Sequence, residues 1–154
     1  FKPYAKGVGG YMNSTLAKID AVNSGYDDAI MLGDNDVVAE GSGQNLFLIK
    51  DGKITTPPIE TGALGGITRK TVIEISQSLS IPLEEKNITI DDLKDADELF
   101  FTGTATEVVG VVSIDGENIG SGTPGDVTNL IRDKYLTIVN GIDGDYHHYL
   151  TLVS

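Results

Sequence analysis

The sequence twice places an aspartate–glycine pair next to apolar runs, at Asp51-Gly52 and at Asp115-Gly116. Such pairs accept the left-handed backbone that a two-residue type I′ turn requires, which makes them strong hairpin signals. The first pair follows the run NLFLIK at Asn45–Lys50, and the second lies within VVGVVSIDGENIG. The chain is therefore predicted to fold back on itself in antiparallel hairpins.

Other short runs extend this strand pattern. Residues 28–32 (DAIML) and 37–40 are separated by the polar segment 33–36, and ELFFTGT at 98–104 has the composition of a buried strand. We expect the first two to pair antiparallel, and the third to lie in the interior.

Helices are predicted where apolar residues recur at helical spacing. Residues 13–24 form the first such segment, with Asn13 or Ser14 available as an N-cap and Gly25 placed to end it. A second helix should begin at Ile67 or Thr68 and run to about residue 80.

Two more helices follow in the second half of the chain. Thr89 can cap a short acidic helix at 89–96, and a final helix at about 126–140 should end at Gly141. With no internal repeat or low-complexity linker, the 154 residues are predicted to form one α+β domain. Its sheet should be strongly bent, antiparallel and barrel-like, with flanking helices.

The charge of the chain excludes some classes of function. A formal net charge of −12 argues against a nucleic-acid or anionic-membrane partner, because phosphate-rich surfaces are bound by positive patches. There is no cysteine, so disulfides and thiolate chemistry are excluded, and no apolar run approaches the length of a membrane span. No leader resembling a signal peptide precedes the first motif, and we expect a cytoplasmic protein.

Glycine-rich turns at 41–43, 61–68, 102–106 and 120–125 can point backbone N–H groups at an anion. The segment 64–68 (LGGIT) is the strongest, since it combines such groups with the positive end of a helix dipole and a hydroxyl. It predicts a phosphate seat. The alternative is that these glycines serve only as turn residues. Neither GxxxxGK[ST] nor GxGxxG after a strand is present.

Lys6 is surrounded by glycines in AKGVGGY. A lysine in such a setting can lose its proton more easily and act as an amine nucleophile, although a merely tight turn would look the same. Glu40 ends an apolar run before a glycine turn and is either a strand-end carboxylate in water or a buried partner for a positive ring nitrogen. His147 and His148 are adjacent and point in different directions, so we expect surface histidines and no metal site.

Five segments resemble a known family in order and spacing. They are AKGVGGYMNSTLAKIDAVNSGYDDAIML, VVAEGSGQNLFLIKDGKITTPP, ALGGITRKTVIEIS, ADELFFTGTATEV and IDGENIGSGTPGDVT. Together they are similar to the C-terminal domain of the fold-type IV (class IV) pyridoxal-phosphate enzymes, and to the branched-chain aminotransferases in particular. The resemblance covers nearly the whole chain.

The resemblance implies a cofactor, pyridoxal 5′-phosphate (PLP), and roles for matching residues. Lys6 would hold PLP as a Schiff base and carry the proton between the substrate α-carbon and the cofactor. Glu40 would pair with the pyridine nitrogen, and Tyr11 would hydrogen-bond the phenolic oxygen. The phosphate would be held by Gly66, Ile67, Thr68 and Thr104, with Gly43 nearby, and Leu64 would pack on the cofactor ring. The backbone N–H groups of Thr104 and Ala105 would hold the substrate carboxylate.

The implied reaction is a ping-pong transfer of the amino group of leucine, isoleucine or valine to 2-oxoglutarate, a step of branched-chain amino acid biosynthesis. D-amino-acid aminotransferases and aminodeoxychorismate lyases share the lysine, the EG turn and the GITR helix start, so these activities, and a non-catalytic domain, remain alternatives. The chain departs from the family at Gly10, usually asparagine, and at Thr106, commonly alanine. These departures concern substrate preference more than the cofactor.

The resemblance also implies a larger protein. The family's phosphate arginine comes from an N-terminal domain, and neither Arg69 nor Arg132 stands at its position. We therefore expect residues 1–154 to be a single PLP-binding C-terminal domain whose N-terminal domain is missing. Alone it would be inactive, and the native protein would be a homodimer or higher homo-oligomer.

Overall fold

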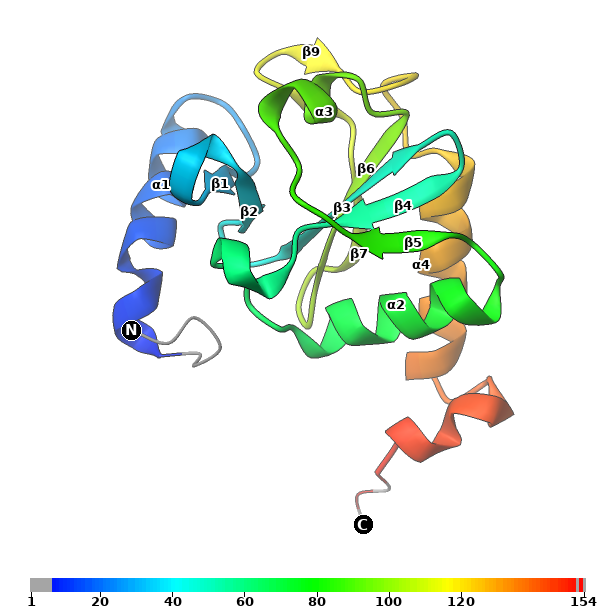
Figure 1. Cartoon of the computed structure of the whole chain (residues 1–154). Helices are drawn as coiled ribbons and strands as arrows, with labels where there is room; N and C mark the ends of the chain where they lie inside the picture. Colours follow the sequence, from blue (N-terminus) through cyan, green and yellow to red (C-terminus); the bar gives the residue numbers. More distant parts are fainter. Residues whose placement is uncertain (1–6, 152, 154) are drawn as a thin grey trace.

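The computed structural model describes residues 7–151 and 153, and its centre is a five-stranded sheet (Figure 1). In this sheet β3 lies in the middle and pairs antiparallel with β4 on one side and β6 on the other, and β6 pairs antiparallel with β7. The order across the sheet is β5 (Leu83–Glu85), β4 (Lys53–Thr56), β3 (Asn45–Lys50), β6 (Glu98–Gly103) and β7 (Glu107–Val111).

Two antiparallel strand pairs lie outside this sheet: β1 (Ile30–Leu32) with β2 (Val38–Gly41), and β8 (Ser113–Ile114) with β9 (Glu117–Asn118). Both aspartate–glycine turns are confirmed. Asp51 and Gly52 have φ angles of 50° and 73°, and Asp115 and Gly116 have φ angles of 49° and 83°. These left-handed values are those that a type I′ turn needs.

The mixed α+β class is confirmed, but two details of the expected sheet are wrong. β5 runs parallel to β4, with Ile54 opposite Leu83, because the crossover through α2 returns the chain in the same direction. The sheet is also open rather than barrel-like. In the described part of the chain β5 and β7 are its two edges and do not pair with each other.

The four predicted helices are present as α1 (Tyr11–Asn23), α2 (Ile67–Ser78), α3 (Ile90–Lys94) and α4 (Asp126–Val139). Short 3₁₀ turns η1, η2, η3 and η4 occupy Val8–Gly10, Asp34–Asp36, Ile59–Thr61 and Gly144–Tyr149. His147 and His148 lie in η4 and are exposed, as expected.

The predicted helix ends are confirmed, but one predicted start is wrong. Gly25 and Gly141 take left-handed φ angles of 89° and 69° just after α1 and α4. Thr89 caps α3 in a reciprocal capping box with Asp92. Asn13 and Ser14, however, lie inside α1, because the 3₁₀ turn η1 runs directly into the helix and starts it at Tyr11.

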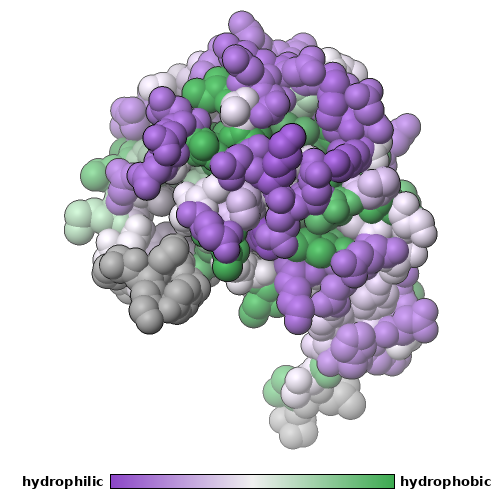
Figure 2. Space-filling view, in the orientation of Figure 1, coloured by the Kyte–Doolittle hydropathy of each residue, from purple (hydrophilic) through white to green (hydrophobic). Residues whose placement is uncertain are grey.

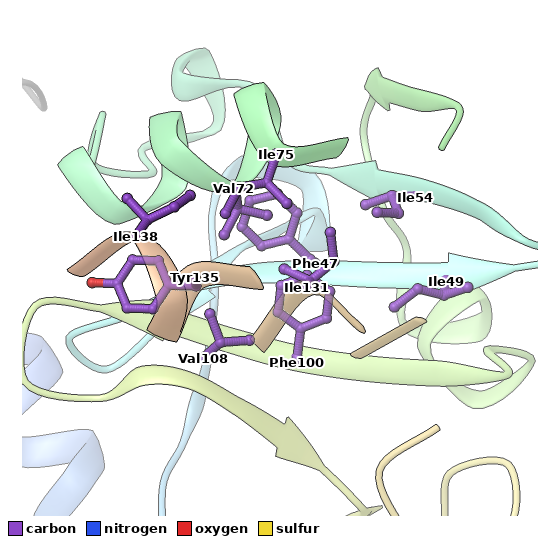
Figure 3. Close-up of a cluster of buried hydrophobic side chains, with 10 residues drawn as sticks. All are labelled: Phe47, Ile49, Ile54, Val72, Ile75, Phe100, Val108, Ile131, Tyr135 and Ile138. Atoms are coloured by element: carbon purple, nitrogen blue, oxygen red, sulfur yellow. The ribbon is translucent and has the colours of Figure 1, made fainter. Parts of the chain in front are cut away.

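Both faces of the sheet are covered, which explains the continuous apolar run of β3. On one face, ten buried residues of the sheet, α2 and α4 form a single cluster (Figure 3). At its centre Phe47 and Phe100 stand opposite each other in the β3–β6 register, with ring centroids 4.9 Å apart and planes 5° from parallel. The alternate residues Leu46, Leu48, Leu99 and Phe101 pack on the other face with Leu93 of α3.

α1 is the exception to this packing. None of its residues is buried, and Met12, Leu16, Ile19 and Val22 are 51–70% exposed at helical spacing. α1 lies at the left of Figure 1, and Figure 2 shows apolar surface at the same edge among largely polar surroundings. Among the described helices, none is long and apolar enough to cross a membrane.

The stacked pair in the main core gives a stability prediction. Phe100→Ala should lower the free energy of unfolding by about 3–5 kcal/mol, because it leaves a cavity against Phe47 that a rigid sheet cannot refill. Val139→Ala on the exposed side of α4 should change it by less than about 0.5 kcal/mol. Urea denaturation followed by circular dichroism measures both, and similar losses in the two variants would contradict this account of the core.

Candidate functional site

Glu40 is held in place at the end of β2 by two donors. Its Oε2 accepts hydrogen bonds from the backbone N–H of Leu64 at 2.9 Å and from Nδ2 of Asn45 at 3.2 Å. The side chain is half-buried rather than a strand-end carboxylate surrounded by water. Glu40 therefore provides a fixed negative charge beside the turn that leads into α2.

Asn45 joins Glu40 to this turn. Its Nδ2 also donates to the carbonyl oxygen of Leu64 at 2.7 Å, and the residue is only 5% exposed. On its other side, a Cβ added to Gly66 would lie 2.3 Å from Oδ1 of Asn45. The glycine is thus required by this close approach and not by its backbone angles, since its φ is −67°. Sequence reasoning missed Asn45, and a polar residue opening an apolar strand was the available signal.

The first turn of α2 has the features of an anion-binding site. Gly66 is the N-cap and supplies no side chain, and the first turn holds no acidic residue. By contrast, the starts of α3 and α4 each have a carboxylate. Asp92 accepts from the N–H of Thr89, the N-cap of α3, and Glu98 accepts from the N–H groups of Val127 and Thr128 at the start of α4. The N–H groups of Ile67 and Thr68 find no acceptor among the described residues. They are left available to a negatively charged ligand.

Two buried side chains of the first turn of α2, Thr68 and Arg69, have different roles. Thr68 is 5% exposed, and its hydroxyl makes no hydrogen bond to another described residue. Arg69 is also buried and donates from Nη2 to the Pro57 carbonyl at 3.0 Å and to Glu85 at 2.6 Å. Arg69 therefore anchors the first turn of α2 to β5, and Glu85 compensates its positive charge.

Gly43 and the turn that contains Thr104 and Ala105 lie at the same end of the sheet. In the β3–β6 register Asn45 stands opposite Thr102, so the residues before β3 adjoin those after β6. A Cβ on Gly103 would lie 3.7 Å from the carbonyl oxygen of Gly43. Thr104 and Ala105 are exposed at this end, above the fully buried Thr102.

Tyr11 is the first residue of α1 and lies close enough to Glu40 to interact with its charge. Burial, followed by the negative charge of Glu40, raises the pKa of the Tyr11 hydroxyl above its ordinary value. Tyr11 is therefore protonated at neutral pH and can donate a hydrogen bond. Lys6 lies outside the described residues. Gly10 has φ −74° and ψ −21°, angles open to any residue, so its backbone conformation does not explain why glycine stands there.

The sequence model of the amino-transferase class IV family matches residues 1–114. The chain belongs to this class IV aminotransferase family. It is 45% identical over 150 residues to a branched-chain-amino-acid aminotransferase of Pseudomonas aeruginosa, with 97% of this chain and 48% of the relative covered. The chain thus spans about half the length of the curated relatives that it matches.

Solved structures agree with this assignment. A branched-chain aminotransferase of the archaeon Thermoproteus uzoniensis, solved with norvaline, has a TM-score of 0.93 and 46% identity, covering 97% of this chain and 49% of that structure. The enzyme of Thermobaculum terrenum in its PLP form has a TM-score of 0.94 and 38% identity, with coverages of 98% and 50%.

The class IV chain thus gathers most of its predicted site residues at one end of the sheet. Hydrogen bonds and close contacts join Glu40, Leu64 and Gly66 through Asn45, the charge of Glu40 reaches Tyr11, and Gly43 adjoins the 103–106 turn. A cavity of about 840 Å³ lies elsewhere, between α1 and β7. Its lining includes Gln44 and Thr106, but none of the described residues that were predicted for the site. That cavity is therefore not the candidate site.

The two glycines before α2 allow a matched test of this arrangement. Gly66→Ala should lower the free energy of unfolding by about 1–3 kcal/mol, because the new methyl group displaces Asn45 and leaves its buried partners unpaired. Gly65→Ala should be nearly neutral, since its methyl group would meet only a methyl of Ile59 at 4.0 Å. Thermal and urea unfolding measure both, and a larger loss at Gly65 would show that the contacts of Asn45 are described wrongly.

Proposed function

We propose that this chain is the cofactor-binding domain of a longer, PLP-dependent branched-chain-amino-acid aminotransferase. The names of its relatives and its span of about half their length support the proposal. The observation that carries it is the connection of Glu40 to the start of α2 through Asn45. A carboxylate suited to a pyridine nitrogen and a helix start suited to a phosphate form one fixed unit.

The residues fit this cofactor. Bound PLP supplies a protonated ring that takes up electrons when the α-carbon of an amino acid loses its proton. Glu40, whose Oε2 is oriented by two N–H donors, would keep the proton on the ring nitrogen through its negative charge. Tyr11, protonated because its pKa is raised, would donate from its hydroxyl to the phenolic oxygen.

The phosphate would be held at the start of a helix and not by a GxxxxGK[ST] loop with its lysine. The N–H groups of Ile67 and Thr68, the Thr68 hydroxyl and the positive end of α2 would bind its oxygens, with Gly66 opening the helix and Gly43 and Thr104 lying near them. Leu64 would pack against the ring. The local arrangement is therefore attractive to an anion although the whole chain carries a formal charge of −12.

Lys6 would be the catalytic residue. Its amine would form a covalent carbon–nitrogen bond to the cofactor with loss of water and, once the substrate amine has replaced it, would take the proton from the substrate α-carbon and deliver it to the cofactor. The backbone N–H groups of Thr104 and Ala105, two exposed residues, would orient the substrate carboxylate. The amino group of leucine, isoleucine or valine would pass to 2-oxoglutarate in two half-reactions.

We further propose a cytoplasmic homodimer or higher homo-oligomer. The apolar stripe Met12, Leu16, Ile19 and Val22 supports this, because a helix with no buried residue gains stability when another surface covers it. Residues 1–154 would contribute the PLP-binding domain, and an additional domain of the longer protein would complete the pocket.

Borohydride trapping tests the cofactor site. We expect the longer protein, incubated with PLP, to absorb visible light and, after borohydride reduction, to carry a stable adduct on Lys6 in peptide mass spectra. Lys6→Ala should abolish the adduct, whereas Lys53→Ala, on an exposed lysine paired with Glu84, should leave it unchanged. An adduct on another lysine would contradict the site, and no adduct would favour a non-catalytic domain.

Substrate assays test the reaction. The longer protein should transaminate L-leucine, L-isoleucine and L-valine with 2-oxoglutarate, because its relatives are named as aminotransferases of branched-chain amino acids. D-alanine and aminodeoxychorismate should be poor substrates. Activity with either of these two and none with L-leucine would instead support a D-amino-acid aminotransferase or an aminodeoxychorismate lyase.

A further inference from the structure

Asp28 lies outside the proposed site, and four donors hold its carboxylate. Oδ2 accepts from Nζ of Lys18 at 2.8 Å and from Nε2 of Gln44 at 2.9 Å. Oδ1 accepts from the Ser42 hydroxyl at 2.5 Å and from the Ala29 backbone N–H at 2.8 Å. The side chain is only 13% exposed. Both of its oxygens are therefore fully engaged in hydrogen bonds.

These donors come from segments that the site needs in a fixed relation. Ser42 and Gln44 flank Gly43 in the turn between β2 and β3, and therefore lie between Glu40 and Asn45. This turn is compact, since the Gly41 N–H donates to the Gln44 carbonyl at 2.7 Å. Lys18 belongs to α1, the helix that begins with Tyr11. Asp28 thus connects the helix of Tyr11 to the turn next to Glu40.

The connection is important because α1 contributes no residue to either core. It buries no residue, and its apolar stripe faces outward. Lys18 donates to Asp28 and also to the Asp27 carbonyl oxygen, so a single side chain ties the middle of the helix to the segment before β1. Without the Asp28 carboxylate, Lys18, Ser42 and Gln44 would each lose an acceptor, and the connection between α1 and the turn would be lost.

We propose that Asp28 is a positioning residue of the cofactor site, which sets the position of Tyr11 relative to Glu40 by holding Lys18 and the Ser42–Gln44 turn together. This inference rests on the proposed function. Although burial opposes it, hydrogen bonds from Lys18, Ser42, Ala29 and Gln44 hold the pKa of Asp28 below its ordinary value, so the carboxylate is charged at neutral pH. In the described part of the chain Asp28 bonds to Lys18, Ala29, Ser42 and Gln44, and it acts through Tyr11 and the turn.

The chain offers a matched control in Asp143. This carboxylate is 14% exposed, pairs with Lys134 and accepts from the Asp145 N–H, but it lies after α4, far along the chain from the site. Asp143→Ala should therefore also cost stability for structural reasons, by removing an ion pair and a backbone hydrogen bond. Only the Asp28 variant should alter the site.

The test uses the longer protein loaded with PLP. We expect Asp28→Ala to lower kcat about tenfold to a hundredfold, because small displacements of a catalytic geometry have effects of this size. It should also shift the pH midpoint of the visible absorption of the bound cofactor, to which Tyr11 and Glu40 contribute. Asp28→Glu should restore part of both, and Asp143→Ala should change neither.

A second measurement needs no cofactor. In the longer protein without PLP, titration of ¹³C-labelled tyrosine, assigned with Tyr11→Phe, should show the pKa of Tyr11 falling toward its ordinary value in Asp28→Ala as the ring moves away from Glu40. Lys18→Met should act in the same direction, and it keeps the protein testable if Asp28→Ala does not fold. Asp143→Ala should leave the pKa of Tyr11 unchanged.

The outcomes separate the two proposals. Absence of cofactor absorption and of transamination in the wild-type protein would overturn the proposed function. An active wild type whose Asp28 and Lys18 variants keep the kcat, the absorption midpoint and the Tyr11 pKa would overturn the role of Asp28 alone. Equal changes in the Asp28 and Asp143 variants would assign Asp28 a general structural role and also overturn it.

Discussion

The antiparallel pairing of β3 with β6 is the interaction on which the rest of the molecule depends. Its register stacks Phe47 on Phe100 and places Leu46 beside Phe101, so each of the two cores takes its central residues from this pair. At its end the same register places Asn45 opposite Thr102. A pairing fixed by apolar burial thus determines which polar residues meet at the edge of the sheet.

At that edge the first backbone N–H groups of α2 have no acceptor among the described residues. Glu98 accepts from the first N–H groups of α4, and in α3 the Thr89 hydroxyl accepts from the Asp92 N–H, but the corresponding groups of α2 have neither a carboxylate nor a capping side chain. A helix start of this kind costs stability until an anion or water binds it. Because Gly66 fits tightly against Asn45, a larger residue that would bring its own cap is excluded there. The sequence thus maintains a ligand-dependent position in a chain whose overall charge would repel anions.

Much of the fold could be predicted from local signals in the sequence. The aspartate–glycine turns, the glycines that end α1 and α4 and the capping box of Thr89 act within a few residues, so a single sequence displays them. The parallel strand β5 could not be found in this way, because its place depends on where α2 returns the chain. The same limit applied to the site. Glu40 and the helix start were recognised as separate motifs, but Asn45, which joins them, was not, since its partners lie up to 19 positions away.

The candidate site therefore consists of two parts with different support. Glu40, Leu64 and Gly66 are tied through Asn45 to the central sheet, and the two cores stabilise their positions. Tyr11 lies on a helix that buries no residue and is tied to the remainder chiefly through Lys18 and Asp28. A ligand that contacted both Glu40 and Tyr11 would add a further connection between the parts. Its binding energy would then depend on how well α1 is already positioned, because an ill-placed helix must first be ordered. A surface covering the apolar stripe of α1 would reduce that cost, and this couples the association of the protein to the affinity of its site.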